Sequence, residues 1–78
     1  MEYTDVLNNV SECYKNVIKK SNVNINNIVN LNEHEMVTFA VLLEKDFDIT
    51  LYPDDIENKS VADIATNIYN GLYNYERQ

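Results

Sequence analysis

Between Met36 and Tyr69 the chain twice places apolar residues at the three- and four-residue spacing of an amphipathic helix. A short segment with the only proline of the chain, Pro53, separates the two runs. This spacing predicts helices that each bury one face, and the proline prevents a simple continuation of one into the other. Both apolar faces must be covered, which favours a fold in which helices pack on helices.

A further helix is expected near the N-terminus. Its apolar face consists of Tyr3, Val6, Leu7, Val10, Cys13, Tyr14, Val17 and Ile18. The pattern fades at Lys19 and Lys20, cations that suit the carbonyl dipole of a helix C-terminus. Residues 21–31 are rich in asparagine, which bonds its own backbone in competition with helix, so we expect an ordered loop. Its apolar residues are expected to lie over the core, namely Val23, Ile25, Ile28, Val29 and Leu31.

Two later helices have recognisable start signals. Asn32 with Glu35 forms a capping-box pattern, and Ser60 with Asp63 has the same spacing. The helix after Asn32 has an apolar stripe of Met36, Phe39, Ala40, Leu43 and Phe47, broadened by Val37, Val41 and Leu42. That breadth predicts packing against more than one neighbour. Residues 54–59 have room only for a short helical turn, and the last helix is expected to bury Val61, Ile64, Ala65, Ile68 and Leu72.

Together these elements predict one all-α domain over residues 1–78, a small four-helix bundle with three main helices and one short helix. A chain of this length has little core to spare for a buried catalytic pocket, so we do not expect an enzyme. Cys13 is the only cysteine, which excludes an internal disulfide and a multi-cysteine zinc site. The sequence shows no signal peptide or membrane-spanning run, and a cytoplasmic location is expected.

The formal net charge of -7 restricts the class of partner. Nucleic acid and anionic membranes are both negatively charged, so neither is an expected partner. A protein with a basic patch is the expected partner, because opposite charges steer association. In isolation we expect a monomer.

From Met36 onward the chain resembles the acyl and peptidyl carrier protein superfamily. Residues 42–49, Leu-Leu-Glu-Lys-Asp-Phe-Asp-Ile, are similar to the end of that family's second helix. Residues 53–65 resemble its short third helix and the Thr-Val-x-Asp-Leu-Ala type of start of its fourth helix. The resemblance covers a little under half of the chain and implies a carrier-type helical bundle.

The resemblance breaks where carriers attach their cofactor. Family members hold substrates on a phosphopantetheine arm, bound to the serine of an Asp-Ser-Leu motif at the start of the second helix. Counted back from Phe47 without gaps, these three positions hold Asn32, Glu33 and His34. A carboxylate has no hydroxyl to attack the pyrophosphate of coenzyme A, so Glu33 cannot accept the arm. The three serines, Ser11, Ser21 and Ser60, lie elsewhere, and no cofactor is expected.

Without an attachment site, the resemblance still implies a surface that partner enzymes recognise. Carriers present carboxylates of the second helix to basic patches on enzymes, and the matching candidates here are Glu33, Glu35, Glu44, Asp46 and Asp48. The implied function is that of a non-catalytic docking module for a biosynthetic enzyme of the fatty acid, polyketide or nonribosomal peptide type. A working carrier with an unusual attachment site is a lesser alternative.

A second function comes from a different class. Residues 51–55, Leu-Tyr-Pro-Asp-Asp, resemble the Tyr-Tyr-Pro and acidic residues of helical immunity proteins that neutralise bacteriocin nucleases. Leu51 replaces the first of those tyrosines. In this interpretation Tyr52 and nearby carboxylates bind a basic nuclease. Tyr52 is also expected to lie near Tyr69, Tyr73 and Tyr75.

Two residues suggest chemistry that their surroundings do not support. His34 lies between Glu33 and Glu35, but adjacent helical side chains point about 100° apart and cannot converge on one metal ion. Cys13 belongs to the apolar face of the first helix, where a buried thiol behaves as a small hydrophobic group. Neither a metal site nor a catalytic residue is predicted.

Overall fold

The computed structural model describes the backbone of residues 2–77 and the side chains of residues 2–72. The elements follow in the order α1 (Tyr3–Ile18), α2 (Glu33–Phe47), the 3-10 turn η1 (Pro53–Asp55) and α3 (Val61–Arg77). Within the described backbone there is no strand, and a single isolated bridge joins Ile28 and Ser60. The predicted all-α class, with three main helices and one short one, is confirmed.

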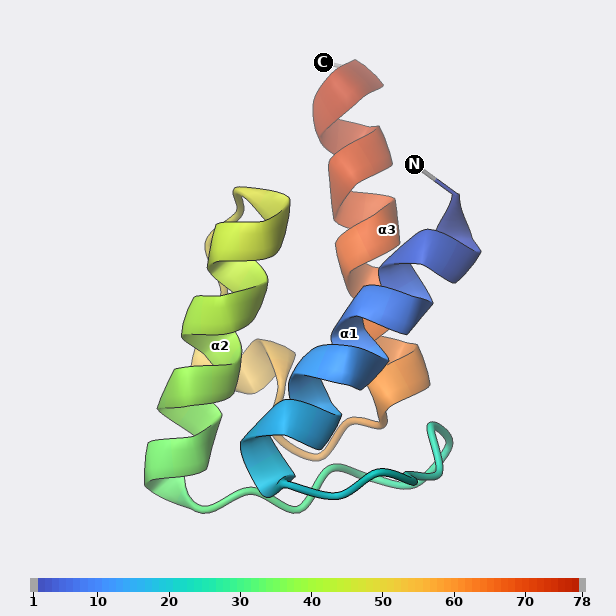
Figure 1. The fold of residues 1–78 in the computed structure, drawn as a ribbon. Coiled ribbons are helices and arrows are strands. Elements are labelled where there is room, and N and C mark those ends of the chain that lie inside the picture. Colours follow the sequence, from blue (N-terminus) through green and yellow to red (C-terminus); the bar gives the residue numbers. More distant parts are fainter. Residues whose placement is uncertain (1, 78) are drawn as a thin grey trace.

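Helix α1 is the central element. It packs against both α2 and α3 and runs in the opposite direction to each of them (Figure 1). The loop from α1 to α2 crosses one end of the molecule, and the segment that includes η1 returns the chain to that end, so α3 starts beside the loop (Figure 1). This arrangement covers the apolar face of α1 from two sides.

One hydrophobic core joins all the elements. Each long helix contributes three or four buried side chains, and single residues come from the connecting segments: Val6, Val10, Cys13 and Tyr14; Phe39, Leu43 and Phe47; Val61, Ile64, Ala65 and Ile68; Val29 and Ile56. The rings of Tyr14 and Phe39 lie 5.7 Å apart between α1 and α2. Ile56 is completely buried, which anchors the segment that contains η1.

The Asn-rich loop is ordered, as predicted. Its backbone is joined to the start of α3 by two hydrogen bonds: Val29 N–H donates to the carbonyl of Lys59 at 2.8 Å, and Ala62 N–H donates to the carbonyl of Ile25 at 2.9 Å. Val29 is buried, but Ile28 is 62% exposed, so the expectation that it covers the core was wrong. Successive side chains of an extended segment point to opposite sides, and Ile28 takes the outer one.

Both predicted helix caps are present. Glu35 N–H donates to Asn32 Oδ1 at 2.8 Å, and Asn32 N–H donates to the Glu35 carboxylate at 3.0 Å. Asp63 N–H donates to Ser60 Oγ at 3.0 Å. These bonds satisfy backbone donors that the first turn of a helix leaves without a partner.

The C-terminal ends of α1 and α2 also lie where the sequence predicts them. Lys19 and Asp48 adopt the left-handed conformation, with φ of 59° and 54°, and so terminate α1 and α2. The short helix was expected over residues 54–59. The structure begins it one residue earlier, at Pro53, and its 3-10 part ends at Asp55.

The broad apolar stripe of α2 differs from expectation. Val37 and Val41 are 59% and 54% exposed, so no further element of the described chain covers them. The breadth of the stripe predicts packing against more than one neighbour, and this prediction is wrong for these two residues. One flank of α2 is therefore apolar and open.

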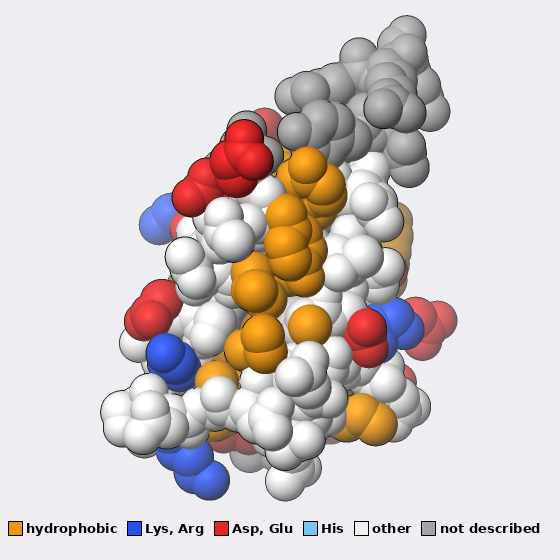
Figure 2. All heavy atoms as spheres, turned by 90° about the vertical axis from the view of Figure 1, so that its right-hand side faces the viewer, with side chains coloured by type: hydrophobic (Ala, Val, Ile, Leu, Met, Phe, Trp, Pro, Cys, Tyr) orange, Lys and Arg blue, Asp and Glu red, His pale blue; other side chains and the backbone are white. Residues whose placement is uncertain are grey.

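On the side of the molecule that faces the viewer in Figure 2, a narrow stripe of apolar side chains runs along α1 and α3. At the junction of these helices Tyr3 and Tyr69 pack edge to face, with ring centroids 5.6 Å apart. The Tyr3 hydroxyl lies 3.2 Å from Thr66 Oγ1. Tyr69 therefore contributes to the α1–α3 junction, and the side chains of Tyr73 and Tyr75, also expected near Tyr52, lie outside the described residues.

Replacing Ser60 with alanine is expected to lower the free energy of unfolding by about 1 kcal/mol, because the α3 cap is lost. Urea unfolding followed by circular dichroism measures the change. Thr38→Ala is the matched control, since the Thr38 hydroxyl is exposed and bonds only the His34 carbonyl within its own helix. Its effect should stay within about 0.5 kcal/mol. Equal losses in the two variants would contradict the assignment of Ser60 as a cap.

Candidate functional site

The carboxylates predicted on α2 occupy different sides of the helix. Glu33 and Glu44 lie on the flank that carries Val37 and Val41, because these four positions succeed one another by three or four residues. Asp48, at the end of α2, instead borders a groove toward α3. Glu33 and Asp48 are exposed, whereas Glu44 is half-buried.

The two remaining carboxylates face elsewhere. The Glu35 side chain closes the capping box with Asn32. Asp46 faces α1, where its Oδ2 atom lies 3.5 Å from Cys13 Sγ and accepts the thiol proton. The five predicted residues therefore do not form one continuous acidic surface.

The open flank of α2 forms one wall of a groove of about 580 Å³, which we call the α2 groove. The opposite wall is the segment around η1. Most of the lining side chains are apolar, and three are glutamates: Leu31, Met36, Val37, Ala40, Val41, Leu51, Pro53 and Ile56, with Glu33, Glu44 and Glu57. The groove thus combines an apolar lining with three carboxylates.

Two contacts hold the walls of the α2 groove together. Glu44 Oε2 accepts the backbone N–H of Leu51 at 2.8 Å, which ties α2 to the segment before η1. The buried side chain of Ile56 fixes the end of that segment to the core. Because both walls are anchored, the fold itself fixes the shape of the groove.

The carboxylates of the α2 groove have no cationic partner in the described part of the chain. Over residues 2–72 the one ion pair is Lys15 with Glu12, 3.4 Å apart on α1. Glu33 and Glu57 are exposed, and neither has an ion pair among these residues. Among residues 2–72, therefore, no cationic side chain compensates the negative charge of the groove.

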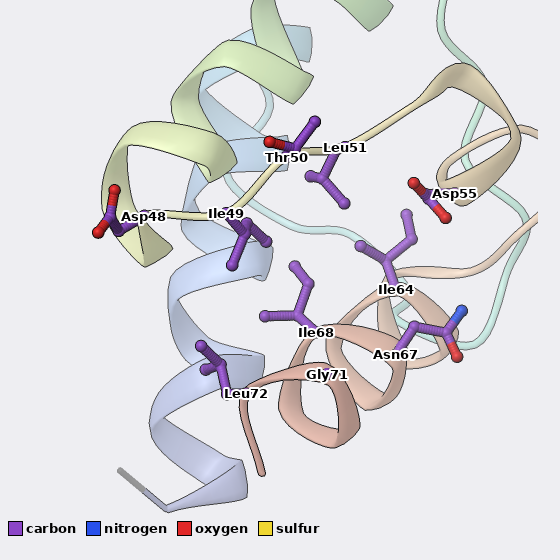
Figure 3. Close-up of a pocket in the computed structure, with 10 residues that line it drawn as sticks. All are labelled: Asp48, Ile49, Thr50, Leu51, Asp55, Ile64, Asn67, Ile68, Gly71 and Leu72. Atoms are coloured by element: carbon purple, nitrogen blue, oxygen red, sulfur yellow. The ribbon is translucent and has the colours of Figure 1, made fainter. Parts of the chain in front are cut away.

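A second groove, of about 570 Å³, lies between α3 and the residues that follow α2 (Figure 3). Aliphatic side chains from the two sides face one another across it, and polar groups stand at its edge: Ile49, Leu51, Ile64, Ile68 and Leu72, with Asp48, Thr50, Asp55 and Asn67. Gly71 also lines it, and a Cβ atom there would meet nothing within 4 Å. We call it the α3 groove.

The residue that the sequence resemblance aligns with the modified serine of carriers is the first residue of α2. This residue, Glu33, is exposed. The serines are placed differently: Ser11 is half-buried within α1, Ser21 is exposed after α1, and Ser60 is buried as the cap of α3. Ser60 Oγ is engaged by Asp63, so Ser21 has the most accessible hydroxyl of the three.

Cys13 is 7% exposed and its thiol donates to Asp46. Burial, then the hydrogen bond to Asp46 and the charges of Asp46 and Glu12, raise the pKa of Cys13 to about 11. The prediction that Cys13 is a buried small side chain is confirmed. A thiol held in its neutral form is a poor nucleophile at neutral pH.

The remaining candidates are on the surface. His34 is exposed in the first turn of α2, and over the described residues no three His, Cys, Asp or Glu side chains are grouped so as to hold a metal ion. Tyr52 is 65% exposed just before η1, and its backbone N–H donates to the Asp55 carboxylate at 2.8 Å. Among the residues that the structure describes, no helix has both the length and the apolar character to cross a membrane.

Sequence reasoning missed three residues of the α2 groove. Val37 and Val41 were expected to pack against a neighbouring element, and Glu57 was given no role. A signal for Val37 and Val41 was present: Glu33, Val37, Val41 and Glu44 share a helix flank about 135° away from Phe39 and Leu43. The position of Glu57 depends on how the η1 segment folds back, which spacing along one helix does not reveal.

No known protein family matches this chain, and no curated protein or solved structure shows significant similarity to it.

The Cys13 thiol is expected to react slowly with iodoacetamide in the folded protein at pH 8, because its raised pKa leaves little thiolate. The rate should climb as the pH approaches 11, where the folded thiol ionises. Asp46→Asn should lower the pKa and speed the reaction, since it removes a nearby negative charge. Intact mass against time measures these rates, and unfolded protein in urea sets the upper limit. Equal rates in the folded and unfolded protein would contradict the assignment.

Proposed function

We propose that this chain is a carrier-type interaction module that has no phosphopantetheine arm and docks a basic surface of a biosynthetic enzyme through α2. The observation that carries the proposal is the negative charge on the open flank of α2. Glu33 and Glu44, with Glu57 opposite, line one groove and have no ion pair in the described residues. A protein with cationic side chains in matching positions would supply the opposite charges for these glutamates.

The order of elements supports a carrier-type interpretation. Three long helices, with a short helical turn before the last, fit the arrangement that the sequence resemblance implies. Glu33 is the first residue of α2, where a helix N-terminus favours an anion. A carboxylate there supplies negative charge but offers no attachment point for an arm.

The mechanism follows from the physics of exposed charges. Carboxylates at the edge of an interface mainly raise the association rate and select for basic partners, and salt screens them. Binding should therefore weaken as ionic strength rises. The chain would scaffold or regulate its partner enzyme without performing a reaction of its own.

A second candidate function is inhibition of a basic nuclease, and the exposure of Tyr52 favours it. The side chain is 65% exposed beside the exposed Asp54. Tyrosine suits the centre of an interface because its ring buries a large area while its hydroxyl keeps a hydrogen bond.

A competition assay tests the docking module. A broad-specificity phosphopantetheinyl transferase labels a standard acyl carrier, and this chain is added as a competitor. We expect it to slow labelling. The double variant Glu33→Lys with Glu57→Lys should raise the half-inhibitory concentration about tenfold, because about 1.4 kcal/mol of attraction is lost.

The control for this assay is Glu12→Lys with Asp63→Lys. Like the test variant it reverses two exposed acids, one of them in the first turn of a helix, and each reversal adds two charges, so both variants change the net charge from -7 to -3. Equal effects of the two double variants would show that only net charge matters. No competition by the parent chain, against the transferase and against a ketosynthase, would overturn the proposed function.

Tyr52→Ala separates the two candidates. If the chain inhibits a nuclease, this variant should lose its protection of DNA against a basic bacteriocin nuclease domain, because the central aromatic contact is removed. In the carrier-type function the same variant should leave the transferase competition unchanged. Protection of DNA by the parent chain that Tyr52→Ala abolishes would replace the docking module with the inhibitor.

A further inference from the structure

We infer that the α2 groove binds a basic amphipathic helix of the partner protein, with apolar residues of that helix seated on Val37 and Val41. This inference rests on the proposed function, because it takes the partner to be a protein with a basic surface. It adds the form of the contact, the residues that make it and the spacing of the partner's charges.

The apolar part of the argument comes from burial. Four large apolar side chains of the described residues are more than half exposed, and two of them, Val37 and Val41, lie side by side in the α2 groove. The other two, Ile28 and Tyr52, are not among its lining residues. Grouped exposed apolar side chains inside a polar edge mark a binding surface, whereas single ones need no explanation.

The shape of the groove favours a helix. Val37 and Val41 are one turn apart, and Glu33 and Glu44 stand toward the two ends of the same flank. At 1.5 Å per residue these glutamates are separated by about 16 Å along the axis. A partner helix that lies along α2 would match them with two basic residues about eleven positions apart and with apolar residues between.

The charge of the groove selects its occupant. Glu33, Glu44 and Glu57 favour lysine or arginine at the edge of the bound helix. A second copy of this chain would place its own carboxylates against them, and two molecules of net charge -7 repel each other. An anionic membrane would be repelled in the same way.

The test uses a fluorescent peptide of about 18 residues, roughly five helical turns, with leucines on one face and lysines about eleven positions apart. Fluorescence anisotropy measures its affinity for the full chain. We expect Val37→Ser with Val41→Ser to weaken binding at least about tenfold. Because both side chains are mostly exposed, the fold should tolerate the change, which thermal unfolding checks.

Two variants and one peptide serve as controls. Ile28→Ser removes an equally exposed apolar side chain away from the groove, and Gly71→Leu places a side chain in the α3 groove; neither should alter the affinity. A scrambled peptide of identical composition should bind at least about tenfold more weakly, because its leucines no longer share one face. Amide shifts in a ¹⁵N spectrum should centre on residues 33–44.

The outcomes separate the inference from the proposed function. Equal binding of the scrambled peptide, or equal effects of Ile28→Ser and the double valine variant, would overturn the helix in the groove. So would amide shifts centred on α1 and α3. The transferase competition could still succeed in these cases, and the docking module would stand without this contact. Loss of competition together with intact peptide binding would overturn the proposed function alone.

Discussion

The structure depends on the two-sided packing of α1. Its apolar face is wide enough to meet α2 and α3 together, and it places Val10, Cys13 and Tyr14 in the core that all three helices share. Burial of apolar area is the main favourable term in folding a domain this small. Because α1 takes the central place, α2 and α3 need only one buried face each.

This packing leaves the rest of α2 free. The core-facing side of α2 buries Phe39, Leu43 and Phe47. The flank with Val37 and Val41 faces away from them and has no structural partner in the described chain. The segment from Leu51 to Ile56 runs beside that flank but does not cover it, because it is tied down at Glu44 and by the burial of Ile56. The same constraints that build the core therefore produce an open groove with an acidic edge.

Much of the fold could be predicted from the sequence, because its determinants are local. Helix periodicity and the caps at Asn32 and Ser60 placed the helices, and the left-handed residues Lys19 and Asp48 lie where the apolar patterns end. The candidate site was less predictable. Spacing along one helix does not say which flank a neighbour covers, so Val37 and Val41 were expected to pack against a second element. Nor does it show that Asp46 faces Cys13.

The resemblance to carriers is based on the order of loop, proline and cap after α2. What it implies for function depends on one position. Glu33, which the sequence resemblance aligns with the modified serine of carriers, begins α2, and the buried Ser60 hydroxyl is occupied as a cap. Under the proposed function, the exposed negative charge of Glu33 serves docking, and no arm is attached at this position. The proposed function therefore requires a carrier-type fold but no carrier chemistry.

The most direct test of that separation is the intact mass of the chain after incubation with coenzyme A and a broad-specificity phosphopantetheinyl transferase. A standard carrier in the same reaction should be fully modified. The account predicts no change in the mass of this chain. A gain of one phosphopantetheine, located by peptide mapping on Ser21 or another serine, would contradict the account and make this protein a working carrier.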